Sequence, residues 1–108
     1  MTLNLPKPIA AYFAADKAGS EAVAQCFKDD AVVKDEGHTH RGRAAIRQWK
    51  EAASARYQYT SEPLACEQKD GKCVVTTRIV GNFPGSPVEL RFFFRLEGDK
   101  IVSLEITP

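Results

Sequence analysis

Residues 88–97 of the chain read Val-Glu-Leu-Arg-Phe-Phe-Phe-Arg-Leu-Glu, and this stretch is the strongest indication of the class of fold. Side chains of a strand point alternately to its two faces. One face of this stretch is apolar and comprises Val88, Leu90, Phe92, Phe94 and Leu96. The other face comprises Glu89, Arg91, Phe93 and Arg95. The alternation predicts a strand whose apolar face is covered by helices and whose other face is half solvated or covered by a second subunit.

Turn residues beside this strand predict that it pairs with the segment that follows. Gly98-Asp99 separates it from Lys100–Thr107, so the two segments are expected to form a hairpin. On the other side, Gly81–Pro87 holds two prolines and two glycines, which makes it a loop rather than part of a sheet. Phe83 in this loop can still pack inward.

A second hairpin is predicted earlier in the chain. Tyr57–Glu67 and Lys72–Val80 flank Lys69-Asp70-Gly71, whose Asp-Gly step is a strong hairpin signal. With Asp70-Gly71 as a two-residue turn, Cys66 would face Val75 and Gln68 would face Cys73. The two cysteines would then not lie directly opposite, so a disulfide between them is not expected, although a different turn would bring them closer.

The first half of the chain is predicted to be mostly helical. Ile9, Tyr12 and Phe13 have helical spacing and predict a helix over about Pro8–Lys17. A short second helix follows, ended by Asp29-Asp30. Its apolar stripe comprises Ala22, Val23, Cys26 and Phe27.

A strand, a loop and a third helix complete this half. The β-branched run Ala31–Asp35 predicts a first strand, and Glu36–Gly42 is interpreted as a polar loop. Arg43–Ala55 is the third predicted helix, with Ile46 and Trp49 on its apolar face. The order of elements favours an α+β fold: three N-terminal helices wrapped around a curved antiparallel sheet of five strands, which forms a cone with an interior.

Length and charge narrow the possible functions. A chain of 108 residues is expected to be a single domain spanning 1–108. Its net charge of +1 argues against nucleic acid as a partner, because phosphate binding needs a basic excess. The apolar runs are too short for a membrane span, and the N-terminus lacks the apolar core of a signal peptide. Three cysteines are too few and odd in number for a secreted disulfide scaffold, which favours the cytoplasm.

Three stretches resemble the nuclear transport factor 2-like superfamily, especially its SnoaL-like and ketosteroid-isomerase-like members. They are Tyr12-Phe13, the run Phe27-Lys28-Asp29-Asp30-Ala31-Val32-Val33-Lys34-Asp35, and His40-Arg41-Gly42-Arg43-Ala44-Ala45-Ile46. The resemblance covers nearly the whole chain and implies the cone-shaped fold. It leaves the function open, because this superfamily contains isomerases, cyclases, epoxide hydrolases and non-catalytic binders.

The resemblance also implies roles for individual residues. Asp35 matches the carboxylate that shuttles the proton in the isomerase, and Tyr12 matches the tyrosine that donates to the oxyanion. The isomerase also uses a protonated acid, and Phe92 stands at the matching position. Because a phenylalanine cannot donate a hydrogen bond, the resemblance favours the broader SnoaL-like class over a steroid isomerase.

Each candidate side chain has an alternative structural role. Asp35 against apolar walls would be a stronger base because desolvation disfavours its charged form, whereas in water it would cap the following loop. Tyr12 is either a donor or a core aromatic residue. His40 is a candidate acid or base at the cavity mouth, with a solvated loop histidine as the alternative. His38 and His40 could ligate a metal together, but a metal site is not expected, because the sequence indicates no third ligand.

Two functions are therefore expected as alternatives. The first is a cofactor-independent isomerase, cyclase or hydrolase that abstracts a proton next to a carbonyl, with Asp35, Tyr12 and His40 as the catalytic residues. Its pocket for a small apolar molecule would be lined by Trp49, Phe83, Leu90, Phe92, Phe94 and Leu104. The second is a non-catalytic ligand-binding or assembly module. Either protein is expected to be a homodimer through the outer sheet face, with no metal or cofactor.

Overall fold

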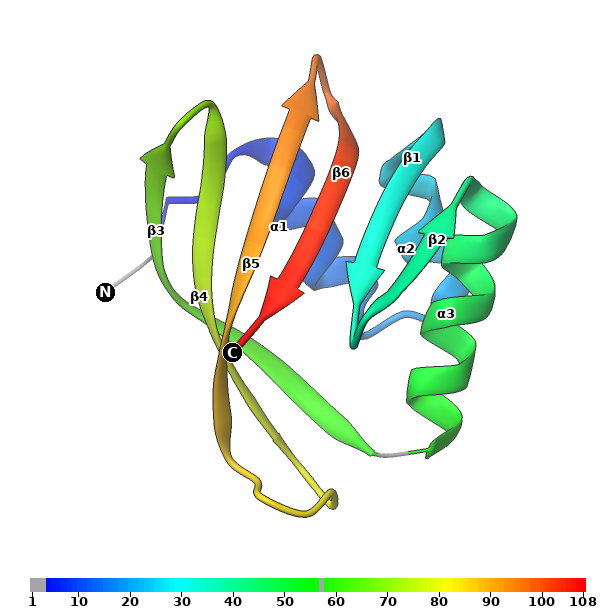
Figure 1. Cartoon of the computed structure of the whole chain (residues 1–108), viewed down its shortest axis with the longest axis vertical. Helices are drawn as coiled ribbons and strands as arrows, with labels where there is room; N and C mark the ends of the chain where they lie inside the picture. Colours follow the sequence, from blue (N-terminus) through cyan, green and yellow to red (C-terminus); the bar gives the residue numbers. More distant parts are fainter. Residues whose placement is uncertain (1–3, 57) are drawn as a thin grey trace.

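The computed structural model describes residues 4–56 and 58–108, and helices cover one face of a curved six-stranded sheet in this part of the chain (Figure 1). The strands follow one another in space in the order β2-β1-β6-β5-β4-β3. Their bounds are β1 Phe27–Asp35, β2 His38–Arg41, β3 Tyr59–Lys69, β4 Lys72–Gly81, β5 Val88–Glu97 and β6 Lys100–Thr107. The α+β class expected from the sequence is confirmed.

The two C-terminal hairpins agree with the sequence. β5 and β6 begin and end where the alternation predicts, and Phe93 of β5 pairs with Glu105 of β6. Phe92 and Phe94 are buried against the helices, while Arg91 is exposed on the other face. Alternating burial along β5 therefore follows directly from its alternating sequence.

The β3–β4 turn is also confirmed. Lys69 pairs with Lys72, which leaves Asp70 and Gly71 as the two turn residues. Their φ angles are 53° and 76°, and a tight hairpin of this type needs positive φ at both positions. β3 continues to Lys69, two residues beyond the predicted end, and its predicted first residue, Tyr57, lies outside the described residues.

The prediction of a loop over Glu36–Gly42 is wrong, because residues 38–41 form β2. β2 pairs with β1 in antiparallel fashion, with Asp35 opposite His38. The turn between them, Glu36-Gly37, has φ angles of 52° and 79° and so matches the Asp70-Gly71 turn. β2 carries no apolar alternation, so only its backbone pairing with β1 identifies it as a strand.

Two further predictions about this region are wrong. Phe27 belongs to β1 rather than to the second helix, so β1 begins four residues before the predicted Ala31. The sheet is also not purely antiparallel and has six strands rather than five in the described part of the chain: β1 runs parallel to β6, with Val33 beside Leu104. This pairing joins the N-terminal β1–β2 hairpin to the four C-terminal strands.

The helices lie close to the predicted positions. They are α1 Lys7–Ala15, α2 Ser20–Gln25 and α3 Arg43–Arg56. In Figure 1, α1 lies behind β5 and β6, and α3 lies beside β2. Apolar residues of the helices and of the inner sheet face form one core, including Ile9, Tyr12, Phe27, Ile46 and Phe94. No helix within residues 4–56 and 58–108 has the length and apolar character needed to cross a membrane.

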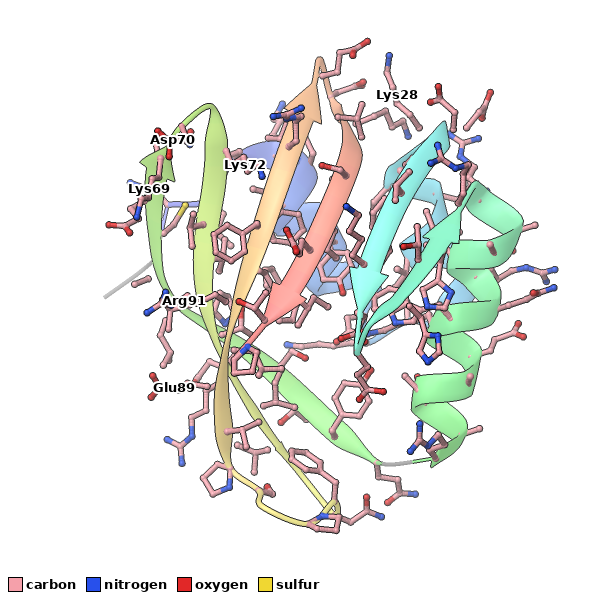
Figure 2. The ribbon with its side chains drawn as sticks, in the orientation of Figure 1. Lys28, Lys69, Asp70, Lys72, Glu89 and Arg91 are labelled. Atoms are coloured by element: carbon pink, nitrogen blue, oxygen red, sulfur yellow. The ribbon has the colours of Figure 1, made fainter. Side chains whose placement is uncertain are left out.

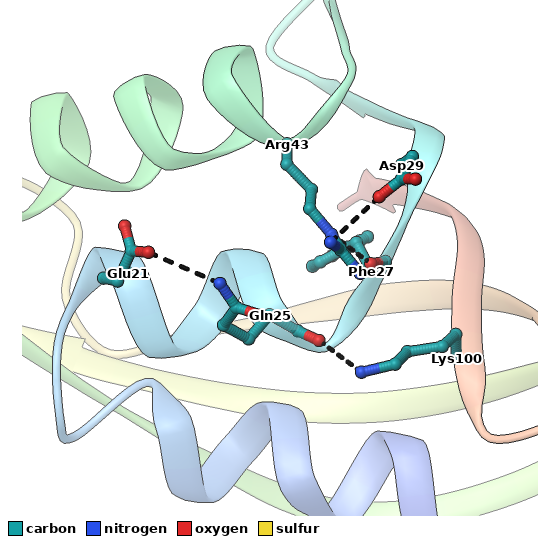
Figure 3. A network of polar contacts seen from close by, with 6 residues as sticks. All are labelled: Glu21, Gln25, Phe27, Asp29, Arg43 and Lys100. Atoms are coloured by element: carbon teal, nitrogen blue, oxygen red, sulfur yellow. Dashed lines mark hydrogen bonds and ion pairs between the residues drawn. The ribbon is translucent and has the colours of Figure 1, made fainter.

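Polar contacts fasten the N-terminus of α3 to β1 (Figure 3). The Arg43 guanidinium donates through Nε to the carbonyl oxygen of Phe27 at 2.8 Å and pairs with the Asp29 carboxylate at 2.9 Å. Nearby, Lys100 donates to the carbonyl oxygen of Gln25 at 2.7 Å, which connects β6 to the end of α2. The Arg43 contacts therefore hold the N-terminus of α3 against β1.

Candidate functional site

A cavity of about 640 Å³ lies between α3, the β1–β2 hairpin and the sheet. Apolar side chains make up most of its wall, and polar or charged groups are grouped at a few points. The apolar lining comprises Trp49, Ala52, Ala53, Ile79, Phe83, Pro84, Val88, Leu90, Phe92 and Ile106. The lining with polar or charged groups comprises Tyr12, Asp35, Glu36, His38, His40, Lys50, Arg56, Tyr59 and Ser61.

Asp35 lines this cavity from the last position of β1 and is half-buried. The indole nitrogen of Trp49 donates a hydrogen bond to its Oδ2 atom at 3.0 Å. The Asp35 carboxylate therefore lies at the cavity wall beside the indole of Trp49. A carboxylate has more lone pairs than one indole can occupy, so it can accept a further proton or hydrogen bond.

Two histidines reach the cavity because β2 pairs with β1. His40 is half-buried opposite Val33, and its ring centroid lies 6.1 Å from that of Trp49. His38 is exposed and pairs with Asp35 across the hairpin. The structure thus brings Asp35, His40 and Trp49 together at one side of the cavity.

Tyr12 lies at the inner end of the cavity and is only 1% exposed. Its ring makes edge-on contacts with Phe13, Phe27, Phe92 and Phe94, at centroid distances of 5.3 to 6.3 Å. Burial raises the pKa of Tyr12 well above its ordinary value, because the phenolate would be desolvated. Tyr12 is thus both a core aromatic residue and a neutral hydroxyl at the cavity wall.

Lys50 is a polar residue of the site that the sequence reasoning missed. It follows Trp49 in α3, and its side chain is only 6% exposed. Its ammonium forms a buried ion pair with Asp16, which ends α1, and donates a hydrogen bond to the Tyr59 hydroxyl at 2.9 Å. The ammonium also lies 5.2 to 5.8 Å from the ring centroids of Tyr12, Trp49 and Tyr59.

Opposing effects act on the protonation of Lys50. Burial lowers the pKa of Lys50, but its partners Tyr12, Asp16 and Tyr59 outweigh burial and hold this pKa well above the ordinary value. The Asp16 carboxylate is the charge that compensates the ammonium, because the two groups form the buried ion pair. Lys50 is therefore a fixed cation beside the cavity.

The sequence could have suggested Lys50 only through its position. It lies next to the apolar residue Trp49 and four residues after Ile46, on the helix face that turns inward. Its partner Asp16 is 34 residues away, and no local pattern links the two.

The six residues predicted to line the pocket divide into two groups. Trp49, Phe83, Leu90 and Phe92 line the cavity. Phe94 and Leu104 do not: they are 0% and 1% exposed and belong to the core beneath it. Phe94 was assigned to the wall from strand alternation, which gives the face of the sheet but not how far along it the cavity extends.

No group of three or more His, Cys, Asp or Glu side chains that could hold a metal is found among the described residues.

Known proteins resemble this chain in sequence and structure. The family model for the SnoaL-like domain matches residues 9–104. A proposed polyketide cyclase from Sinorhizobium meliloti is 39% identical, with 95% of each chain covered and a TM-score of 0.90. No curated protein matches the chain significantly.

Two more distant structures share the fold. A protein with a ketosteroid isomerase-like fold from Catenulispora acidiphila, in complex with trimethylamine, is 20% identical over 97% of this chain and 87% of that one, with a TM-score of 0.84. SalBIII, an epoxide hydrolase/cyclase-like enzyme in salinomycin pyran ring formation, is 21% identical over 93% of this chain and 86% of its own, with a TM-score of 0.78. The matched family model, the 39% identical relative and the shared fold together establish that the chain belongs to the SnoaL-like family.

Proposed function

We propose that the protein is a cofactor-independent enzyme of the isomerase or cyclase type, which abstracts a proton next to the carbonyl of a mostly apolar substrate. In this reaction the C–H bond beside the carbonyl breaks and its proton moves to the Asp35 carboxylate. The bonding electron pair moves toward the carbonyl oxygen and forms an enolate. Tyr12 donates a hydrogen bond to that oxygen, and His40 assists at the cavity mouth.

The observation that carries this proposal is the position of Asp35 on the wall of a largely apolar cavity, held by Trp49 at 3.0 Å. A general base must be fixed in place, and one hydrogen bond to Oδ2 orients the carboxylate without occupying all of its lone pairs. A volume of about 640 Å³ is within the usual range for small-molecule sites. Trp49, Phe83, Leu90 and Phe92 would contact the apolar parts of the substrate.

Relatives support the class of reaction. The Sinorhizobium meliloti relative is a proposed polyketide cyclase, and SalBIII is an epoxide hydrolase/cyclase-like enzyme. Cyclases that act on polyketides work on carbonyl compounds, for which a carboxylate base in an apolar pocket is suitable chemistry. We place the protein in the cytoplasm, in line with its sparse cysteines.

Exchange of carbon-bound hydrogen tests this function without knowledge of the natural substrate. The protein is incubated in D₂O with 2-tetralone, an apolar ketone whose carbonyl is separated from the aromatic ring by one acidic CH₂ group, and loss of that CH₂ signal is followed by NMR. We expect Asp35→Asn to slow the catalysed exchange by about 100-fold or more. Asp30→Asn, which changes an exposed carboxylate of the same strand, is the matched control and should leave the rate unchanged. Equal rates for wild type and Asp35→Asn would overturn the proposal.

A non-catalytic binding or assembly module is the second candidate function, and Phe92 favours it. Phe92 is 4% exposed in the cavity wall and adds an apolar ring where a second donor would assist an enolate. Such a module would bind apolar ligands equally well in the wild type and in the Asp35→Asn variant, and it would exchange no proton.

Under either function we propose a homodimer through the outer face of β5. Phe93 is half-buried there between Arg91 and Arg95, and Figure 2 labels Arg91 and Glu89 along this strand. An apolar ring framed by arginines is typical of an interface core with a polar rim. Phe93→Glu is expected to convert dimers to monomers in sedimentation experiments. Leu64→Glu, at an exposed apolar residue of β3, is the matched control.

A further inference from the structure

The contacts of Lys50 assign a direction to the hydroxyl of Tyr59. An ammonium group has three N–H donors and no acceptor, so in the 2.9 Å contact the Tyr59 oxygen accepts. The O–H proton of Tyr59 is therefore not used in this contact and must point to another acceptor. Tyr59 is half-buried and lines the cavity, so a ligand bound in the cavity would lie next to it.

Lys50 itself is held rigidly. The Asp16 carboxylate pairs with it from the end of α1, and three aromatic rings surround the ammonium. A buried ion pair contributes little net stability compared with an apolar pair of similar size, so its presence at the cavity calls for another role. A cation that donates to a phenol oxygen polarises the O–H bond and makes that phenol a stronger donor.

Tyr12 and Tyr59 differ in the surroundings of their hydroxyl groups. Tyr12 is almost fully enclosed by aromatic rings at the inner end of the cavity. Tyr59 has the ammonium directly at its oxygen and is more exposed to the cavity.

We propose that Tyr59 is a second hydrogen-bond donor of the cavity, directed at the carbonyl or enolate oxygen of the ligand, with Lys50 and Asp16 as its positioning residues. This inference rests on the proposed function and deepens it, because it specifies that the ligand presents an oxygen anion or carbonyl to the α3–β3 side of the cavity. Tyr59 would then supply the donor that Phe92 cannot.

Ligand binding tests the role of Tyr59. The probe is 2-naphthol, whose oxygen stands in for an enolate oxygen, and naphthalene is the matched ligand without that oxygen. We expect Tyr59→Phe to weaken 2-naphthol binding by about tenfold, the size of one hydrogen bond, and to leave naphthalene binding unchanged. Thr60→Val removes a hydroxyl from an exposed position of the same strand outside the cavity, and should change neither affinity.

Three outcomes would overturn the inference: wild-type affinities for both ligands in Tyr59→Phe, an equal loss in Thr60→Val, or no binding of 2-naphthol by the folded wild-type protein. None of these involves turnover. The proposed function depends instead on the exchange rate of Asp35→Asn, so each hypothesis can fail while the other stands.

A spectroscopic measurement tests the positioning role of Lys50. The pH at which bound 2-naphthol ionises is read from its excitation spectrum. The double variant Asp16→Asn/Lys50→Gln keeps a neutral pair but removes the cation, so we expect bound 2-naphthol to ionise at higher pH than in wild type. Lys50→Arg keeps the positive charge, so bound 2-naphthol should ionise in this single variant at a pH close to that in wild type. The other titratable and charged groups of the cavity lining are the same in all of these proteins: Tyr12, Asp35, Glu36, His38, His40, Arg56 and Tyr59. An unchanged ionisation pH in the folded double variant would show that Lys50 has only a structural role.

Discussion

The indole nitrogen of Trp49 lies 3.0 Å from Oδ2 of Asp35, and this hydrogen bond connects α3 to the end of β1 across the cavity wall. Trp49 thereby combines two roles that its apolar position in the helix does not distinguish. Its ring packs against the core, and its one polar atom orients the carboxylate proposed as the base.

Trp49→Phe should separate these two roles. The variant keeps an aromatic ring but removes the N–H donor, so Asp35 loses the bond that orients it. We expect the free energy of unfolding to fall by about 1 kcal/mol, and kcat for hydrogen exchange to fall more than KM rises. Urea denaturation and exchange kinetics measure the two effects. A variant with wild-type kcat would contradict an orienting role for Trp49.

Lys50→Met should be among the most destabilising single changes in the chain. It leaves the buried Asp16 carboxylate without its cation, and breaking a buried pair in this way costs about 3–5 kcal/mol. The double variant Asp16→Asn/Lys50→Met removes both charges and should recover much of this loss. Thermal denaturation of the two variants measures the difference. Equal melting temperatures would show that the unpaired Asp16 charge is not what destabilises Lys50→Met.

Alkaline pH should destabilise the fold. Burial raises the pKa of Tyr12 above its ordinary 10.0, the partners of Lys50 raise its pKa above 10.5, and burial with the nearby Cys66 raises the pKa of Cys73 from 9.0 to about 12. In each case the folded protein keeps a proton that the unfolded chain loses first. The stability from these groups is therefore complete below about pH 9 and declines as the pH rises further.

Urea unfolding between pH 8 and 11 measures this decline. Each group contributes a slope of up to about 1.4 kcal/mol per pH unit within its window. Tyr12→Phe has no titrating hydroxyl, so its stability should fall less steeply above pH 10. Stability that is constant from pH 8 to pH 11 would contradict the buried, protonated state of these groups.

Cys66 and Cys73 should form a disulfide on mild oxidation. Their register is the predicted one, with Cys66 opposite Val75 and Cys73 opposite Gln68, yet their sulfur atoms lie 2.7 Å apart as two free thiols. Strand twist brings one diagonal of a pair of strands closer than the other, which explains the contact. Hydrogen peroxide would remove one hydrogen from each thiol, giving the disulfide and two molecules of water.

Mass spectrometry after peroxide treatment tests this pairing. The expected product is lighter by two hydrogen atoms and contains a cross-linked peptide pair from β3 and β4. Cys26, the third free cysteine, should stay reduced in the same sample. Cys66→Ser should abolish the product, whereas Cys26→Ser should leave it intact. Equal reaction of all three thiols would show that the contact does not guide oxidation.

Much of the sheet could be predicted from local patterns in the sequence. In β5 apolar and polar residues alternate except at Phe93, and the pleat turns this alternation directly into burial. At Asp70-Gly71 the residue types permit positive φ, which sets the register of the whole β3–β4 pair. For the site, Asp35, Tyr12, His40 and Trp49 were identified from the sequence, and the structure places all four on the cavity.

Elements without a local apolar pattern could not be found in this way. β2 is polar along its length and is a strand only because β1 offers it backbone partners. The parallel pairing of β1 with β6 joins segments about 70 residues apart, and nothing in either segment specifies the direction of its neighbour. Phe94 and Leu104 lie in the core and not in the cavity wall. This too could not be predicted, because the extent of the cavity depends on how far the helices extend over the sheet.

Local patterns in the chain were enough to establish the α+β class, the two C-terminal hairpins and the inward face of β5, because these depend on side-chain periodicity and on turn residues a few positions apart. The packed structure was needed to show that Lys50 is a buried cation paired with Asp16 and Tyr59, and that Cys66 meets Cys73. Charge compensation and diagonal contacts depend on distances between atoms of different elements, which exist only once the helices have packed on the twisted sheet.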